Sequence, residues 1–152
     1  MKLEKYPTTQ DFADRDLLIV VYREYQKRKS IYDRDRSIPS KAREWSKKVN
    51  EFVLVFNKLR DLVPKAEALT LVSGTNQKRG IEKLLKYVDK EVQKREELYP
   101  KWVRQRKMKY EDAFRQLQGM KSVFNKLLDL KETLEGVQEE LKLKFEDETD
   151  QD

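Results

Sequence analysis

The sequence predicts an all-α fold: an up-and-down helical bundle of about four helices with a long C-terminal helix and a disordered acidic tail. Charged residues make up 41% of the 152 positions and hydrophobic residues only 38%. The buried surface must therefore be narrow stripes, as on slender helices rather than in thick layered folds. Gly and Pro number four each, whereas a sheet protein of this length needs more turn residues.

A chain of this length fits one domain, which we place at residues 1–145, with the tail at 146–152. We expect no internal repeat. The longest apolar run, Leu17 to Tyr22, is far shorter than the roughly 20 residues that cross a bilayer. Cysteine is absent, which is compatible with a reducing compartment. We therefore expect a soluble, intracellular protein that does not bind membranes.

The first helix is predicted to begin around Pro7 to Thr9, where a Thr oxygen caps free amides, and to end near Lys29. The next begins around Pro39, which suits a first helical turn. Its apolar residues recur at spacings of three and four, as in a coiled coil, up to the helix stop at Pro64. They are Ala42, Trp45, Val49, Phe52, Phe56, Leu59 and Val63.

A third helix is predicted to carry the same pattern, interrupted by Arg95, and to break at Tyr99 and Pro100. Its apolar positions are Ile81, Leu85, Val88, Val92, Tyr99 and Trp102. From Lys101 a long pattern runs to Phe145 with one change of phase. This segment either projects or folds back near Gly119 or Gly136, and we favour the fold-back because it buries the stripe inside a four-helix bundle.

The charges are segregated along the chain. Residues 129–152 carry ten acids and three bases, whereas residues 1–128 carry 18 acids and 31 bases. Residues 146–152 contain five acids and no apolar side chain, which predicts disorder. A body this basic attracts polyanions, and the acidic end either restrains that binding or contacts a basic partner.

Enzymatic chemistry is not indicated by any motif. Histidine, the usual general base and metal ligand, is absent. Three carboxylate pairs are candidate Mg²⁺ ligands, but each lies among bases and is better explained by capping or ion pairing. These pairs are Asp14 with Asp16, Asp33 with Asp35, and Glu96 with Glu97. Residues 69–80 resemble a phosphate loop without its Gly-Lys-Ser/Thr end. We therefore expect no catalytic residues, no metal, no cofactor and no small-molecule ligand.

Two basic stretches are better candidates for a functional surface. Residues 23–48 hold ten bases and four acids with interleaved aromatics, and residues 94–109 hold seven bases and two acids. Bases beside aromatics are typical of nucleic-acid binding, although Trp45 and Trp102 have the spacing of core residues. The candidate binding residues are Arg23, Lys27, Arg28, Lys29, Arg34, Arg36, Lys41, Arg43, Lys78, Arg79, Lys101, Arg104, Arg106 and Lys107.

The pattern predicts a non-enzymatic binding protein whose basic face docks on nucleic acid, on a nucleic-acid-handling complex or on an acidic protein surface. The alternative is a self-assembling structural subunit, of virion or scaffold type. Such a subunit would form homo-oligomers through its helix seams and through head-to-tail attraction between the basic body and the acidic end.

Overall fold

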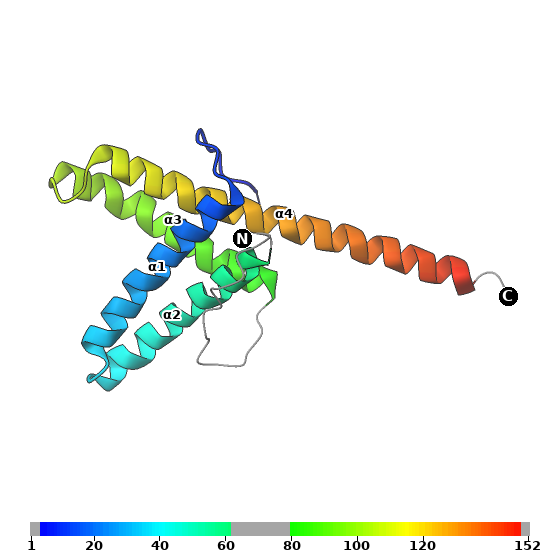
Figure 1. Ribbon diagram of the computed structural model, residues 1–152, viewed down its shortest axis with the longest axis horizontal. Coiled ribbons are helices and arrows are strands. Elements are labelled where there is room, and N and C mark those ends of the chain that lie inside the picture. Colours follow the sequence, from blue (N-terminus) through cyan, green and yellow to red (C-terminus); the bar gives the residue numbers. More distant parts are fainter. Residues whose placement is uncertain (1–3, 62–79, 150–152) are drawn as a thin grey trace.

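A computed structural model of the chain describes residues 4–61 and 80–149, apart from the side chains of residues 145 and 147–149 (Figure 1). The described residues form four helices and no strand: α1 (Asp14–Asp35), α2 (Pro39–Arg60), α3 (Ile81–Arg104) and α4 (Tyr110–Thr149). This confirms the all-α class. The helix α4 continues to Thr149, four residues into the predicted tail, and residues 150–152 lie outside the described part.

The helices are arranged as two antiparallel hairpins. The helix α1 packs mainly on α2, and α3 packs mainly on α4. The connected ends of both hairpins lie at one end of the long axis of the molecule, where they diverge, and the C-terminal part of α4 projects at the opposite end (Figure 1). The molecule is therefore elongated, with two hairpin ends on one side and a single helix on the other.

One hydrophobic core joins all four helices. Its most buried side chains include Val21, Phe52, Leu85 and Phe124, one from each helix. Such burial stabilises the fold by about 1.5–3 kcal/mol for each large apolar side chain. The heptad positions predicted for α2 and α3 supply much of this core, whereas Trp45 and Trp102 are only half-buried.

The two hairpins repeat each other in sequence, so the expectation of no internal repeat is wrong. Residues 17–32 and 84–99 are identical at eight of 16 positions, and residues 55–62 and 123–130 at seven of eight. The first pair is offset by 67 residues and the second by 68. The repeat is hard to see because helix-forming residues vary freely on solvent faces, so most of the matches are core and ion-pair positions, with a few exposed ones such as Gln26 with Gln93.

The start of α1 differs from the prediction. Residues 4–13 are not helical, because the amide of Tyr6 donates to Asn125 Oδ1 at 2.7 Å and the amide of Thr9 donates to Gln118 Oε1 at 2.9 Å. The Asn125 amide nitrogen donates back to the Tyr6 carbonyl at 2.9 Å. This segment thus crosses to the second hairpin, which local capping signals cannot reveal. At its other end α1 continues to Asp35, beyond the predicted Lys29.

The predicted break at Pro100 is also wrong. The helix α3 runs through Pro100 to Arg104, and Pro100 is exposed. A proline on a solvent face removes one helical hydrogen bond, but the free carbonyl remains hydrated, so the helix continues. The true end is a Schellman motif in which Lys107 N donates to Trp102 O and Arg106 N donates to Val103 O. The helix α2 ends at Arg60, and the predicted stop at Pro64 lies outside the described residues.

The favoured fold-back of the C-terminal segment is wrong as well. The helix α4 is continuous over 40 residues and passes through both Gly119 and Gly136. Gly119 faces α1, where an added Cβ would lie 2.9 Å from Val20 Cγ2, whereas Gly136 has open space around it. Gly119 therefore permits close helix packing and is no turn. Beyond Lys131 the described side chains of α4 are exposed.

Candidate nucleic-acid interface

Two arginines and two glutamates cross-link the hairpins in the interior. Arg28 Nε donates to Glu24 Oε1 at 3.1 Å, and Arg95 Nε donates to Glu91 Oε1 at 3.0 Å, each within one helix. Between helices, Arg28 Nη2 donates to Glu91 Oε2 at 3.0 Å and Arg95 Nη2 donates to Glu24 Oε2 at 2.9 Å. We name these four residues the Arg–Glu quartet.

The quartet has the symmetry of the repeat. Glu24 and Arg28 occupy the same repeat positions as Glu91 and Arg95. The Nη1 atoms make matching bonds to backbone: Arg28 Nη1 donates to the Lys48 carbonyl of α2, and Arg95 Nη1 donates to the Gln116 carbonyl of α4. Arg28 Nη1 also donates to Glu51 Oε2 at 3.3 Å, a bond without a counterpart on Arg95, because the repeat position of Glu51 is Gly119. These reciprocal bonds define a local pseudo-two-fold axis that exchanges the α1–α2 hairpin with the α3–α4 hairpin.

Electrostatics keep the quartet charged although its members are nine-tenths or more buried. Burial alone would raise the pKa of Glu24, but the charges of Arg95 and Arg28 outweigh it and hold that pKa below its usual 4.5. Nearby Tyr99 is affected mainly by burial, which raises its pKa to about 12. The quartet orients the two hairpins, and therefore their ends, relative to each other.

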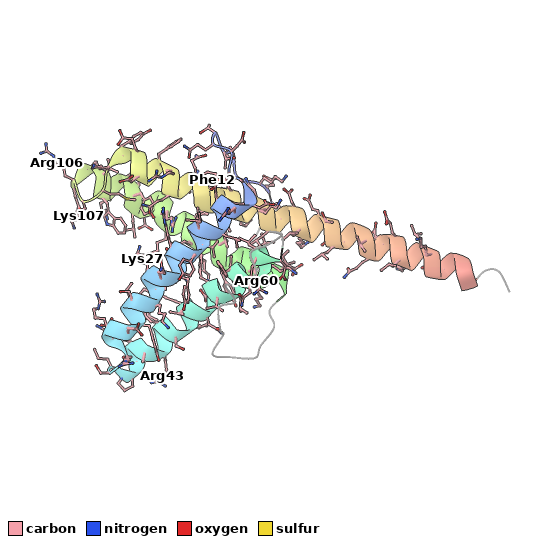
Figure 2. All side chains as sticks on the ribbon, viewed as in Figure 1. Phe12, Lys27, Arg43, Arg60, Arg106 and Lys107 are labelled. Carbon is pink, nitrogen blue, oxygen red and sulfur yellow. The ribbon has the colours of Figure 1, made fainter. Side chains whose placement is uncertain are left out.

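The end of the α1–α2 hairpin forms the first basic surface, which we call tip one. Residues 36–43 contain three bases and no acid: Arg36, Lys41 and Arg43. All three side chains are exposed, and Arg43 lies near the end of this hairpin (Figure 2). Lys29, about two turns back along α1, is exposed too. Arg34 bonds Asp35 Oδ2 at 3.1 Å, which neutralises part of its charge.

The end of the α3–α4 hairpin forms the second surface, tip two. Residues 101–109 contain five bases and no acid, and all five bases are exposed: Lys101, Arg104, Arg106, Lys107 and Lys109. Arg106 and Lys107 lie at the extremity of the hairpin (Figure 2). Arg106 has a φ of 57°, in the left-handed region that favours glycine. A base is thus present where glycine is the preferred residue.

The other predicted binding residues do not all belong to these surfaces. Arg28 is buried in the quartet and cannot contact an external ligand, so its assignment to the basic face is corrected. Arg23 lines a cavity of about 520 Å³ between α1, α4 and the N-terminal segment, which Arg95 of α3 also lines. Lys27 lies with its Nζ 5.7 Å from the centre of the Trp102 ring. Lys78 and Arg79, with all of the phosphate-loop-like stretch except Gly80, fall outside the described residues.

The aromatic residues of the basic stretches are mostly engaged with protein. The Trp102 ring lies 5.6 Å from the Tyr99 ring, and Lys48 Nζ lies 4.4 Å from the Trp45 ring. Tyr110 and Phe114, near tip two, are more exposed, but their rings stack on each other. The tips therefore present positive charge more than free aromatic faces.

One member of each candidate carboxylate pair has a basic partner. Asp14 pairs with Lys126 at 3.0 Å, Asp35 with Arg34, and Glu96 with Lys121 at 3.2 Å. Within the described ranges, no group of three or more acidic side chains is placed to hold a metal ion. Likewise, no described helix is long and apolar enough to cross a membrane.

Glu24 and Glu91 are the residues that sequence reasoning missed. A signal was present, because Glu24 and Arg28 continue the three-four spacing of Leu17 and Val21, just as Arg95 interrupts the apolar stripe of α3.

Searches against protein-family models, curated proteins and solved structures give no match to this chain.

Proposed function

We propose that this protein is a non-enzymatic binding protein whose two basic tips dock on nucleic acid. The observation that carries the proposal is the placement of tip one and tip two at the same end of the molecule, each free of acidic residues along its chain segment. Clustered bases attract phosphates and release condensed counterions, which makes binding strong at low salt.

The acidic part of the chain supports this proposal by its position. Residues 132–149 of α4, which we call the acidic extension, carry seven acids and two bases. The extension projects at the end of the long axis opposite the tips (Figure 1). It therefore does not cover the basic surfaces within one molecule, so the tips remain accessible to a polyanion.

The test is a binding titration by fluorescence anisotropy with labelled DNA and RNA, single- and double-stranded, at 50 and 200 mM salt. We expect measurable binding at 50 mM salt that weakens by roughly tenfold or more at 200 mM. A chain lacking residues 146–152 serves as the control for the tail and should bind within about threefold of the full chain, because the extension lies far from the tips. No detectable binding by either chain would refute the proposal.

Self-assembly is the second candidate function, and one observation favours it. The acidic extension exposes apolar side chains that no other described element covers: Leu134, Val137, Leu141 and Leu143 are 44–61% exposed. An acidic helix at one end and basic tips at the other suit head-to-tail contacts between copies. Sedimentation velocity at high protein concentration and low salt tests this, and a strict monomer there would exclude it.

A further inference from the structure

We infer that the ligand is a nucleic-acid duplex, which the two tips grip together through its phosphates as two symmetry-related contacts. This inference rests on the proposed function and specifies the form of nucleic acid. It starts from the pseudo-two-fold axis of the quartet, because that axis places the ends of the two hairpins in equivalent positions on either side of it.

The basic residues of the tips follow the same repeat. At the offset of 68 residues, Arg36 of tip one corresponds to Arg104 of tip two, and Lys41 corresponds to Lys109. All four side chains are exposed, and none of them has a described ion-pair partner within 4.0 Å. Each tip thus carries a matched pair of exposed cations, of which Lys41 and Arg104 lie in helices and Arg36 and Lys109 lie in the adjoining connections of residues 36–38 and 105–109.

The spacing of the tips suits one duplex. Arg36 lies eight residues from Arg28 and Arg104 lies nine residues from Arg95, which is about 12–14 Å along each helix at 1.5 Å per residue. With about 10 Å added for the distance between packed helices, Arg36 and Arg104 are separated by no more than about one duplex turn, which is about 34–36 Å. A duplex has two-fold axes of its own that relate the phosphates of its strands, so a protein with two equivalent contacts can hold both strands alike.

Single strands are a poorer fit to this surface. Their binding normally depends on bases stacked on exposed aromatic side chains beside the cations. The half-buried rings of Trp45 and Trp102 each have a lysine Nζ nearby, of Lys48 and Lys27 respectively. Tip one has no counterpart of the exposed Tyr110, because the matching residue is Ala42. Phosphate contacts from two rigid points are independent of base sequence, so we expect no preference among duplex sequences.

Matched double variants test the inference in the full chain. The tip-one variant is R36Q/K41Q, the tip-two variant is R104Q/K109Q, and the control is K86Q/K90Q. The control removes two exposed bases from the first half of α3, away from both tips. Circular dichroism verifies that all three remain folded. Anisotropy titrations use duplexes of 6 and 30 base pairs and a 30-nucleotide single strand at several salt concentrations.

We expect each tip variant to bind the 30-base-pair duplex at least tenfold more weakly than the wild type at 50 mM salt. Each should also reduce the slope of log K against log salt by about 2, because two phosphate contacts are lost. The control should stay within about threefold. The wild type should prefer the 30-base-pair duplex to both the single strand and the 6-base-pair duplex, since the latter is too short for both tips.

Tighter binding of the single strand than of the duplex would overturn the inference while leaving the proposed function intact. Dependence on one tip only, or equal losses in the control, would overturn the inference and also the assignment of binding to the two tips. Competition by an acidic polypeptide as effective as competition by the duplex would indicate a protein partner instead. Absence of binding to every nucleic acid would be a failure of the proposed function itself.

Discussion

At the residue scale, the Arg–Glu quartet is the feature on which the arrangement of the hairpins depends. Its four charges are buried, and every buried side-chain nitrogen or oxygen in the described part of the chain has a hydrogen-bond partner. A buried ion pair contributes little net stability, because desolvation offsets the attraction, but loss of one partner leaves an uncompensated charge. The quartet therefore fixes the way α1 crosses α3 more than it adds to the free energy of unfolding.

The first prediction concerns removal of one quartet member. Arg95→Met should lower the free energy of unfolding by about 3–5 kcal/mol, because Glu24 and Glu91 then remain buried without that cation. The quadruple variant E24L/R28M/E91L/R95M should lie within about 2 kcal/mol of the wild type. Urea unfolding followed by circular dichroism measures both. A loss below 1 kcal/mol for the single variant would contradict this account.

The quartet also predicts acid sensitivity. Because the folded-state pKa of Glu24 lies below 4.5, its charge stabilises the protein at pH values above that value. The stabilisation is lost as the pH falls through 4.5 toward the lower folded-state pKa. Urea midpoints between pH 7 and pH 3 should thus fall for the wild type, and the quadruple variant should lose less. An identical pH dependence in both proteins would exclude this role for Glu24.

Substitution of Arg106 is predicted to have opposite effects on stability and on binding. Arg106→Gly should stabilise the fold by about 0.5–1 kcal/mol, because glycine adopts the left-handed conformation without strain. The same change removes a base from tip two and should weaken nucleic-acid binding. Arg106→Ala is the control, since it removes the charge and keeps the strain. Thermal unfolding and anisotropy distinguish the two variants, and equal stability of both would refute the strain argument.

At the element scale, α4 combines a packed half with a free half. Residues up to Leu128 supply buried core side chains such as Phe124 and Leu127, whereas residues 132–144 are exposed. One continuous helix thus serves the bundle at one end and projects at the other. A projecting helix has only its own hydrogen bonds to stabilise it. Its amide hydrogens therefore exchange with solvent faster, and its end frays more readily, than in the bundle.

Two glycines in α4, one in each half, allow the packed half and the free half to be tested separately. Gly119→Ala should destabilise the fold by about 1–3 kcal/mol, because the new methyl group meets Val20 on α1. Gly136→Ala should leave global stability nearly unchanged and slow amide exchange in the extension, since alanine favours helix by about 1 kcal/mol. Chemical unfolding and hydrogen exchange measure the two effects. Destabilisation by both substitutions would indicate that the extension is packed.

At the scale of the whole molecule, the basic and acidic residues are separated along the long axis. The tips, with their cluster of bases, lie at one end of the long axis and the acidic extension at the other (Figure 1). A molecule with this polarity has an orientation-dependent field, which would steer the polyanion of our proposal toward the tips. The same polarity favours head-to-tail contacts between copies at low salt.

Solution scattering tests the projecting extension. A compact chain of this length has a radius of gyration of about 15 Å, whereas a 40-residue helix alone is about 60 Å long. We expect a radius of gyration well above the compact value at both low and high salt. A chain ending at residue 131 is the control and should be more compact. A full chain as compact as this control would mean that the extension folds back.

Much of the fold was predictable from sequence. Apolar spacings of three and four identified α2 and α3, and charge counts identified the two basic stretches that contain the tips, because these signals are local. Sequence reasoning failed at the N-terminal segment and at Pro100. The amides of Tyr6 and Thr9 bond to residues more than 100 positions away, and the tolerance of Pro100 depends on which face of α3 is solvated.

The sequence by itself determined the all-α class, the apolar stripes and the segregation of charge, since each follows from the periodicity and composition of single segments. Only the tertiary structure decided that α4 projects, that Arg28 is buried and that the two basic tips lie at one end of the molecule. These outcomes depend on which helices contact each other. That choice is set by close packing at Gly119 and by the reciprocal ion pairs of the quartet, which join residues about 70 positions apart.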